Sequence, residues 1–85
     1  MPYTVSLKRS AEKEVDALSP RIHDKVIKAI LALKKNPYPR NVKRLRGREG
    51  ARIRVGNCRI LYLVNDSSKE IEVFSVADRK DVYRH

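Results

Sequence analysis

The chain has 85 residues, of which 41% are hydrophobic, and its 20 lysines and arginines against 10 acidic residues give a net charge of +10. This length predicts one domain over residues 1–85 with a modest core and excludes a multidomain architecture. A single cysteine, Cys58, excludes an internal disulfide, and with only two histidines it leaves no cluster of zinc ligands, so we expect no metal or other cofactor.

The sequence shows neither a signal-peptide pattern nor an apolar run of the ~20 residues that span a membrane, so we expect a cytoplasmic protein without membrane contact. The strong positive charge is typical of a protein that binds nucleic acid, an anionic membrane or an acidic protein. Residues 34–59 concentrate this charge, with ten basic residues and a single acid, Glu49.

The first third of the chain predicts a strand followed by two helices. Residues 3–7 alternate between apolar and polar side chains, which favours a strand with one buried face. Apolar side chains at helical spacing then predict helices over residues 8–18 and 20–33. Ser19 and Pro20 separate them, since serine is a favoured N-cap and proline suits the first helical turn. So short a connection predicts an antiparallel helical hairpin.

The remainder of the chain predicts an irregular loop and three strands. Residues 36–50 contain two prolines and two glycines and lack usable periodicity, which favours an ordered basic loop. Strands are predicted over residues 51–55, 58–64 and 70–76, and the second is almost all apolar, as expected of a central strand covered on both faces. The order βααβββ predicts an α+β fold, with a small antiparallel-rich sheet and the N-terminal helical hairpin packed on one face.

A tight turn joins the first two strands of this group. Gly56-Asn57 places glycine first, the sequence sign of a type II′ turn, and such a turn would set Arg54 opposite Arg59. Because side chains alternate along a strand, both would share the face away from the core with Arg52. Like charges directly opposite destabilise a sheet, so the arrangement indicates a phosphate-binding surface. The alternative for any single arginine is a solvated edge strand.

Further candidate residues lie in the basic loop and near the C-terminus. The loop cations expected to extend an RNA-binding surface are Lys43, Arg44, Arg46 and Arg48. Arg79 either adds a fourth cation to the hairpin site or pairs with a neighbouring aspartate, and Tyr83 either stacks on a base or seals the core. His85 is a weaker candidate for a proton carrier. His23 is expected to be a surface or partly covered side chain, and Cys58 is expected to point into the core.

These features resemble the RelE/ParE superfamily of bacterial and archaeal toxins from type II toxin–antitoxin pairs, over nearly the whole chain. The motifs that carry the resemblance are A-x-K-E at residues 11–14, KRLRG at 43–47, RIRVGxxRIxY at 52–62, SVADR at 75–79 and DVY at 81–83. Each motif is weak alone, whereas their order within a chain of this length is specific. The resemblance implies a single RelE-like domain.

The RelE branch implies a ribosome-dependent endoribonuclease that cuts mRNA without metal, by attack of the RNA's 2′-hydroxyl, leaving a 2′,3′-cyclic phosphate and a 5′-hydroxyl. The resemblance places Arg52 and Arg54 where relatives have lysines tied to activating the 2′-hydroxyl. It assigns Arg59 to steadying the phosphorane, Arg79 to protonating the leaving 5′-oxygen and Tyr83 to stacking a base. Arginine is a poor general base, so we expect Arg52 and Arg54 to clamp the RNA and stabilise charge.

The resemblance also implies partners: a cognate acidic antitoxin, the ribosome and mRNA. We expect a hetero-oligomer with the antitoxin and a monomeric toxin when free. Two alternatives stay open at this point. A ParE-like toxin would bind a protein target such as gyrase and catalyse nothing, and a plain RNA-binding module would need only the basic stretch of residues 34–59.

Overall fold

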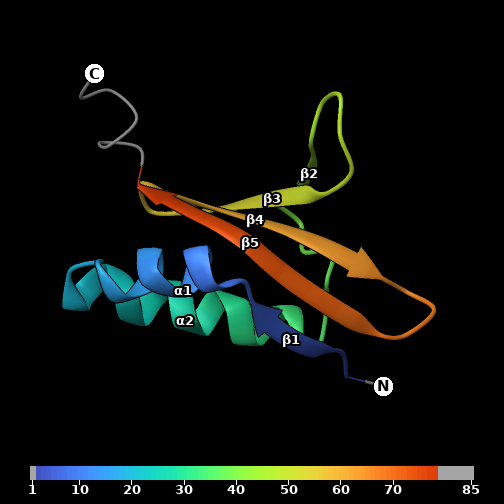
Figure 1. The fold of residues 1–85 in the computed structure, drawn as a ribbon, viewed down its shortest axis with the longest axis horizontal. Helices are drawn as coiled ribbons and strands as arrows, with labels where there is room; N and C mark the ends of the chain where they lie inside the picture. Colours follow the sequence, from blue (N-terminus) through green and yellow to red (C-terminus); the bar gives the residue numbers. More distant parts are fainter. Residues whose placement is uncertain (1, 79–85) are drawn as a thin grey trace.

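The computed structural model describes residues 2–78 (Figure 1). Its elements are β1 (Thr4–Leu7), α1 (Arg9–Asp16), α2 (Pro20–Leu33), β2 (Lys43–Arg44), β3 (Ala51–Val55), β4 (Cys58–Asn65) and β5 (Glu70–Asp78). The predicted α+β class and helical hairpin are confirmed, and every predicted boundary falls within two residues of the observed one. The one element that the sequence did not predict is β2.

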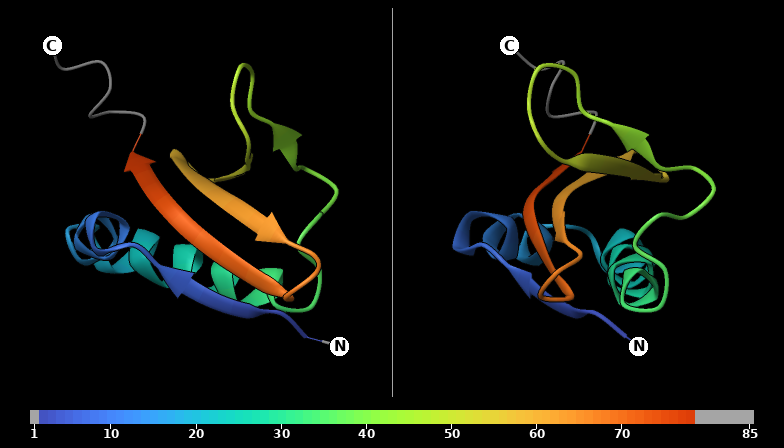
Figure 2. Two further views of the ribbon diagram at one scale, coloured as in Figure 1. Left: turned by 45° about the vertical axis from the view of Figure 1, so that its right-hand side comes forward. Right: turned by 90° about the vertical axis from the view of Figure 1, so that its right-hand side faces the viewer.

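The five strands form one sheet in the order β1-β5-β4-β3-β2. β1 pairs with β5 in parallel, and the other neighbours are antiparallel. The pairing of β1 with β5 joins the two ends of the described chain at one edge of the sheet, whereas β2 forms the other edge (Figure 2). The loops that lead into β2 and β3 therefore stand apart from the edge that holds the N-terminus.

Both helices lie against the same face of the sheet, beside β4 and β5 (Figure 1). Their apolar residues recur at helical spacing, so each helix turns one stripe inward. The buried side chains of the core are Ala11, Val15, Val26, Ile30, Leu33, Ala51, Ile53, Cys58, Ile60, Tyr62, Ile71, Val73 and Val76. Cys58 is 0% exposed, which confirms its expected place in the core. Within residues 2–78, neither helix is both long and apolar enough to cross a membrane.

β4 is covered on one face only, which contradicts the expectation drawn from its nearly continuous apolar sequence. Its burial alternates strictly over residues 58–63, so Ile60 and Tyr62 are buried while Leu61 and Leu63 are half-buried. The reason is that both helices pack on the same side of the sheet. The opposite face, which carries the arginines of the β3–β4 hairpin, stays largely open.

The segment predicted to be irregular over residues 36–50 contains β2, which pairs antiparallel with β3 and sets Lys43 opposite Arg52. The Leu45 amide donates to the Gly50 carbonyl at 3.1 Å and closes this hairpin. Gly50 has a φ of +127°, and a Cβ there would lie 2.9 Å from the Leu45 side chain, so the position requires glycine. A strand of two cations carries no alternation of apolar and polar residues, which is why the pattern missed it.

Tyrosine hydroxyl groups fix the segment between α2 and β2. The Tyr62 hydroxyl donates to the Pro37 carbonyl at 2.7 Å in the core, and burial raises the pKa of Tyr62 to about 12. The Tyr38 hydroxyl donates to Asp66 at 2.9 Å, and the Tyr3 hydroxyl donates to the other oxygen of the same carboxylate at 2.6 Å. The path of the chain toward β2 is therefore set by contacts with β4 and with the turn that follows it.

Candidate functional site

The β3–β4 hairpin forms as the sequence predicts. Gly56 has a φ of +59°, as the first turn residue of a type II′ turn requires. The second turn residue, Asn57, must have a negative φ. It does, because within residues 2–78 Lys69 is the only non-glycine residue whose φ is positive. The register sets Arg54 directly opposite Arg59. The predicted pairing of like charges across the hairpin is confirmed.

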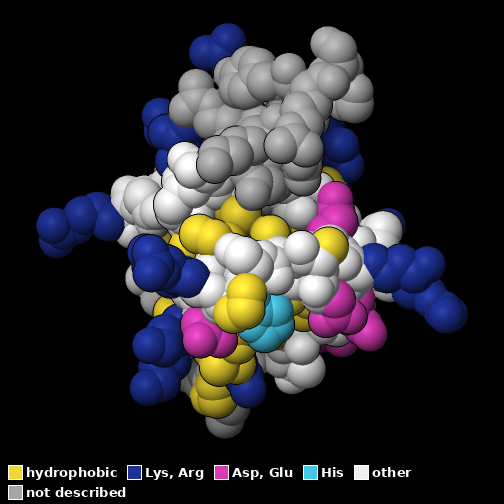
Figure 3. All heavy atoms as spheres, turned by 90° about the vertical axis from the view of Figure 1, so that its left-hand side faces the viewer, with side chains coloured by type: hydrophobic (Ala, Val, Ile, Leu, Met, Phe, Trp, Pro, Cys, Tyr) yellow, Lys and Arg dark blue, Asp and Glu magenta, His cyan; other side chains and the backbone are white. Residues whose placement is uncertain are grey.

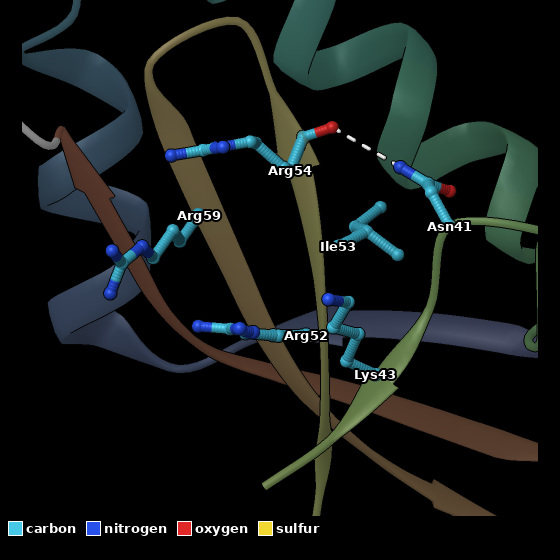
Figure 4. Close-up of a pocket in the computed structure, with 6 residues that line it drawn as sticks. All are labelled: Asn41, Lys43, Arg52, Ile53, Arg54 and Arg59. Atoms are coloured by element: carbon cyan, nitrogen blue, oxygen red, sulfur yellow. Dashed lines mark hydrogen bonds between the residues drawn. The ribbon is translucent and has the colours of Figure 1, made fainter.

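A small pocket of about 140 Å³ lies beside this hairpin (Figure 4). The residues that line it, hereafter the arginine pocket, are Asn41, Lys43, Arg52, Ile53, Arg54 and Arg59. Arg54 is exposed, and Arg52 and Arg59 are half-buried. Figure 4 shows the three arginine side chains projecting toward one side, while Asn41 and Lys43 lie on the neighbouring segment across from β3. The structure thus brings together three of the predicted catalytic residues.

The cations of the arginine pocket have no carboxylate partner among the described side chains. The described side chains do place the His23 imidazole 3.6 Å from the Asp24 carboxylate on α2, and the partial exposure of His23 agrees with its prediction as a surface or partly covered side chain. Figure 3, which faces the end of the molecule where α1 and α2 connect, shows acidic side chains on either side of the histidine. None of the acidic side chains that the structure describes lines the arginine pocket.

Guanidinium groups without an internal counter-charge suit a phosphate ligand. Arginine holds two phosphate oxygens at once in a planar fork and keeps its charge at any working pH. Arg52 and Arg54 stand two residues apart on one strand, a spacing of about 6.6 Å, which matches neighbouring phosphates along a nucleic-acid strand. The arrangement is able to hold a backbone in place and to stabilise negative charge as it develops.

Asn41 is a lining residue of the pocket that the sequence analysis missed. Its side-chain amide donates to the Arg54 carbonyl at 3.3 Å, which ties the segment before β2 to β3 (Figure 4). The two residues are 13 positions apart and lie in different elements. No local pattern in the sequence signals such a contact, because it depends on how β2 pairs with β3.

The four loop cations predicted to bind RNA do not share one surface. Lys43 lines the arginine pocket, whereas Arg44 and Arg48 line a larger hollow of about 1090 Å³. The Arg48 guanidinium lies 4.8 Å from the centre of the Phe74 ring, and Arg46 is exposed in the loop. The acids that line the larger hollow are Glu49, Asp66, Glu70 and Glu72. The lining of that hollow therefore mixes both signs of charge, whereas the charged residues described in the lining of the arginine pocket are all cations.

Arg79, Tyr83 and His85 lie outside the described residues, so their roles rest on the sequence. β5 ends at Asp78, opposite Cys58 in the register, and the described chain therefore ends beside the β3–β4 hairpin. Within residues 2–78, no group of three or more histidine, cysteine or acidic side chains is placed to hold a metal ion.

Comparison with known proteins adds a family and several related structures. A family profile described as "ParE toxin of type II toxin-antitoxin system, parDE" matches residues 5–83. The chain is similar to the toxin–antitoxin complex RelBE2 from Mycobacterium tuberculosis, with 31% identity and a TM-score of 0.81 over 93% of this chain and 100% of that one. It is also similar to the archaeal RelE–RelB complex from Pyrococcus horikoshii OT3, with 25% identity and a TM-score of 0.83 over 100% of both chains.

The isolated RelE toxin from E. coli shares the fold, with 23% identity and a TM-score of 0.78 over 89% of this chain and 83% of that one. A search of curated proteins gives no significant match.

Proposed function

The chain belongs to the ParE toxin family of type II toxin–antitoxin systems, within the RelE/ParE superfamily, and from this premise we propose that it is a ribosome-dependent mRNA endoribonuclease. The observation that carries the proposal is the arginine pocket, where four cations and no acid line one small site among residues 2–78. A toxin that only bound a protein would not need cations grouped at the spacing of RNA phosphates. Cutting mRNA on the ribosome would inhibit translation.

In the proposed reaction, Arg52 and Arg54 clamp the phosphates that flank the cut and hold the 2′-hydroxyl in line with the scissile phosphorus. The 2′-oxygen bonds to phosphorus, and Arg59 stabilises the charge of the phosphorane. The bond to the 5′-oxygen then breaks and leaves a 2′,3′-cyclic phosphate and a 5′-hydroxyl. Arg79 protonates the leaving oxygen, and Tyr83 stacks on a base. The RNA supplies the nucleophile, so the reaction requires no metal.

The proposed activity requires an inhibitor, because an enzyme that cuts translated messages in the cytoplasm would stop the growth of its host. The similar structures from M. tuberculosis and P. horikoshii are toxin–antitoxin complexes. We propose that this chain likewise forms a hetero-oligomer with a cognate antitoxin and is monomeric when free. A net charge of +10 favours an acidic and flexible partner, since opposite charge steers association and a disordered segment wraps a small domain.

A second function is favoured by the family whose profile matches, which is that of ParE. A ParE-like toxin would bind a protein target such as gyrase and would leave RNA intact. The arginine pocket would then be a contact surface for that protein, and its residues would affect binding without affecting any rate of cleavage.

Primer extension on an mRNA in programmed ribosomes separates the two functions. With the purified protein we expect new stops that require ribosomes, persist in the presence of a chelator and disappear when the nucleotide 5′ of the cut is 2′-deoxy. A supercoiling assay with purified gyrase runs in parallel. Intact mRNA together with inhibited gyrase would replace the endoribonuclease proposal by the ParE-like one.

A further inference from the structure

The proposed cleavage requires a group that takes the proton of the 2′-hydroxyl, and the arginines of the pocket are unsuited to this step. A guanidinium group stays protonated at any working pH, so it accepts no proton. Lysine differs, because its amine becomes neutral in suitable surroundings and then serves as a general base. Among the side chains that line the arginine pocket, Lys43 alone is of this kind.

The backbone around Lys43 holds it against the pocket. In the register of β2 and β3, Lys43 lies opposite Arg52, and Figure 4 shows its side chain reaching from β2 toward β3. Two residues earlier, Asn41 donates to the Arg54 carbonyl at 3.3 Å. Two residues later, the Leu45 amide closes the hairpin with a hydrogen bond of 3.1 Å. The position of Lys43 is thus fixed from both sides, although β2 is an edge strand.

Among the described side chains of the arginine pocket, the charges that face Lys43 all have the same sign. Among the described strands β2 pairs with β3 alone, and the charged groups that face it are Arg52 and Arg54 on β3 and Arg59 on β4. No acid lines the arginine pocket among the described residues. The lining of the arginine pocket thus combines three groups that hold phosphate with one amine, that of Lys43, and this amine is the one cationic group of the lining able to accept a proton.

We infer that Lys43 is the general base of the reaction, an inference that rests on the proposed function. The neutral Lys43 amine takes the proton of the 2′-hydroxyl as the 2′-oxygen bonds to phosphorus and the bond to the 5′-oxygen breaks. The leaving oxygen takes a proton from Arg79, which solvent then reprotonates. The Lys43 ammonium returns its proton to solvent. The step therefore consumes no proton and needs no reactant besides RNA and water.

The conservative variant Lys43→Arg separates a base from a phosphate contact, because it keeps the positive charge and removes the ability to accept a proton. Single-turnover cleavage in programmed ribosomes and affinity for those ribosomes are measured for the same preparation. We expect unchanged affinity and a cleavage rate lower by about 10²–10⁴-fold. Lys28→Arg, the same exchange at an exposed position of α2, is the matched control and should cleave like the wild type.

A rescue experiment gives a second measurement. Lys43→Cys is alkylated with 2-bromoethylamine, which restores an amine of lower pKa than lysine at this position. We expect cleavage to return, with the pH–rate profile moved toward lower pH relative to the wild type. Treated wild-type protein controls for the native Cys58, which is 0% exposed and sheltered from the reagent.

The outcomes distinguish this inference from the proposed function. If the wild type cleaves mRNA and Lys43→Arg cleaves at a similar rate, Lys43 is a phosphate contact and the inference fails while the proposed function stands. If the rescued amine restores cleavage without moving the pH profile, the inference fails in the same way. If the wild type leaves mRNA intact on ribosomes, the proposed function fails and the role of Lys43 with it.

Discussion

At the start of β4, Arg59 faces Arg54 across the hairpin without a carboxylate partner among the described side chains, whereas just past its end Asp66 accepts hydrogen bonds from two tyrosines. These two tyrosines, Tyr3 and Tyr38, form with Asp66 what we term the Asp66 clasp. Hydrogen bonds from their hydroxyls lower the pKa of Asp66, and the same bonds raise the pKa of both tyrosines. At the Asp66 end of the strand the polar side chains are hydrogen-bonded to one another. At the Arg59 end the described side chains offer the two arginines no acidic partner.

The difference separates a structural end of the sheet from a binding end. The Asp66 clasp joins the residue before β1, the segment before β2 and the β4–β5 turn, so its contacts hold together parts of the chain that are distant in sequence. The arginine pocket places like charges opposite each other, which costs stability and retains the capacity of each guanidinium for a ligand. Substitutions at the two ends should therefore have opposite consequences for stability and cleavage.

The largest expected effect is on cleavage, at the binding end. Arg59→Ala should lower the rate of cleavage in programmed ribosomes by about 10²–10³-fold, because one preorganised charge at the developing phosphorane is lost. Its affinity for ribosomes should change far less, since the other cations of the pocket remain. Equal and modest losses of rate and affinity would show that Arg59 is one phosphate contact among several.

The next effect is on stability, near the structural end. Tyr62→Phe should lower the free energy of unfolding by about 1–3 kcal/mol, because the buried Pro37 carbonyl loses its donor. Tyr38→Phe is the matched control, and its loss should be smaller because water replaces the exposed hydroxyl. Both variants should cleave like the wild type at a temperature where they are folded. The free energy of unfolding is measured by chemical denaturation, and a value for Tyr62→Phe equal to that of the wild type would contradict this account of the core.

A smaller loss is expected at the free edge of β5. β1 pairs with β5 only as far as Val73, and beyond it the Val76 amide donates to the Glu14 carboxylate at 2.8 Å. Glu14→Ala should lower the free energy of unfolding by about 1 kcal/mol, since the half-buried amide regains water as a partner. Glu14→Gln keeps an acceptor and should lose less. Equal losses in the two variants would show that the hydrogen bond to Val76 contributes nothing.

The smallest effect concerns the pH dependence of the Asp66 clasp. The lowered pKa of Asp66 means that its contribution to stability is present above the usual value of 3.8 and is lost as the pH falls through the folded pKa. The raised pKa values of Tyr3 and Tyr38 mean that their contribution is present below 10.0 and is lost as the pH rises. The difference in melting temperature between wild type and Asp66→Ala should therefore be positive between these limits and vanish at both extremes. A difference that does not change with pH would exclude the clasp as its cause.

Local patterns were sufficient for most of the fold. The helical stripe of residues 20–33, the glycine of the Gly56-Asn57 turn and the period-two alternation of β3 each depend on neighbours in sequence. They predicted the helix bounds, the turn and the register that sets Arg54 opposite Arg59. The same alternation placed three arginines on one face, and the basic loop offered Lys43 as an RNA-binding residue, so four of the six residues that line the arginine pocket were candidates from the sequence.

Long-range pairing was not predictable from the same patterns. β2 consists of two cations and forms by pairing with the edge of β3. Neither this pairing nor the resulting positions of Lys43 and Asn41 at the pocket can be recognised from neighbouring residues in the sequence. The apolar run of β4 predicted coverage on both faces of the strand, but both helices pack on one side of the sheet and the other face of β4 is only half-buried. Arg79 and Tyr83 remain predictions from the sequence.

The contrast between the two ends of β4 is tested most directly by the stability of Arg54→Gln, measured by chemical denaturation at low and at high ionic strength. We predict a free energy of unfolding about 0.2–1 kcal/mol above that of the wild type at low ionic strength, with the gain shrinking as salt screens the repulsion from Arg59. Lys28→Gln, which removes the same charge from α2, should gain less. A variant less stable than the wild type at both ionic strengths would contradict the account, because Arg54 would then contribute to the fold rather than to a ligand site.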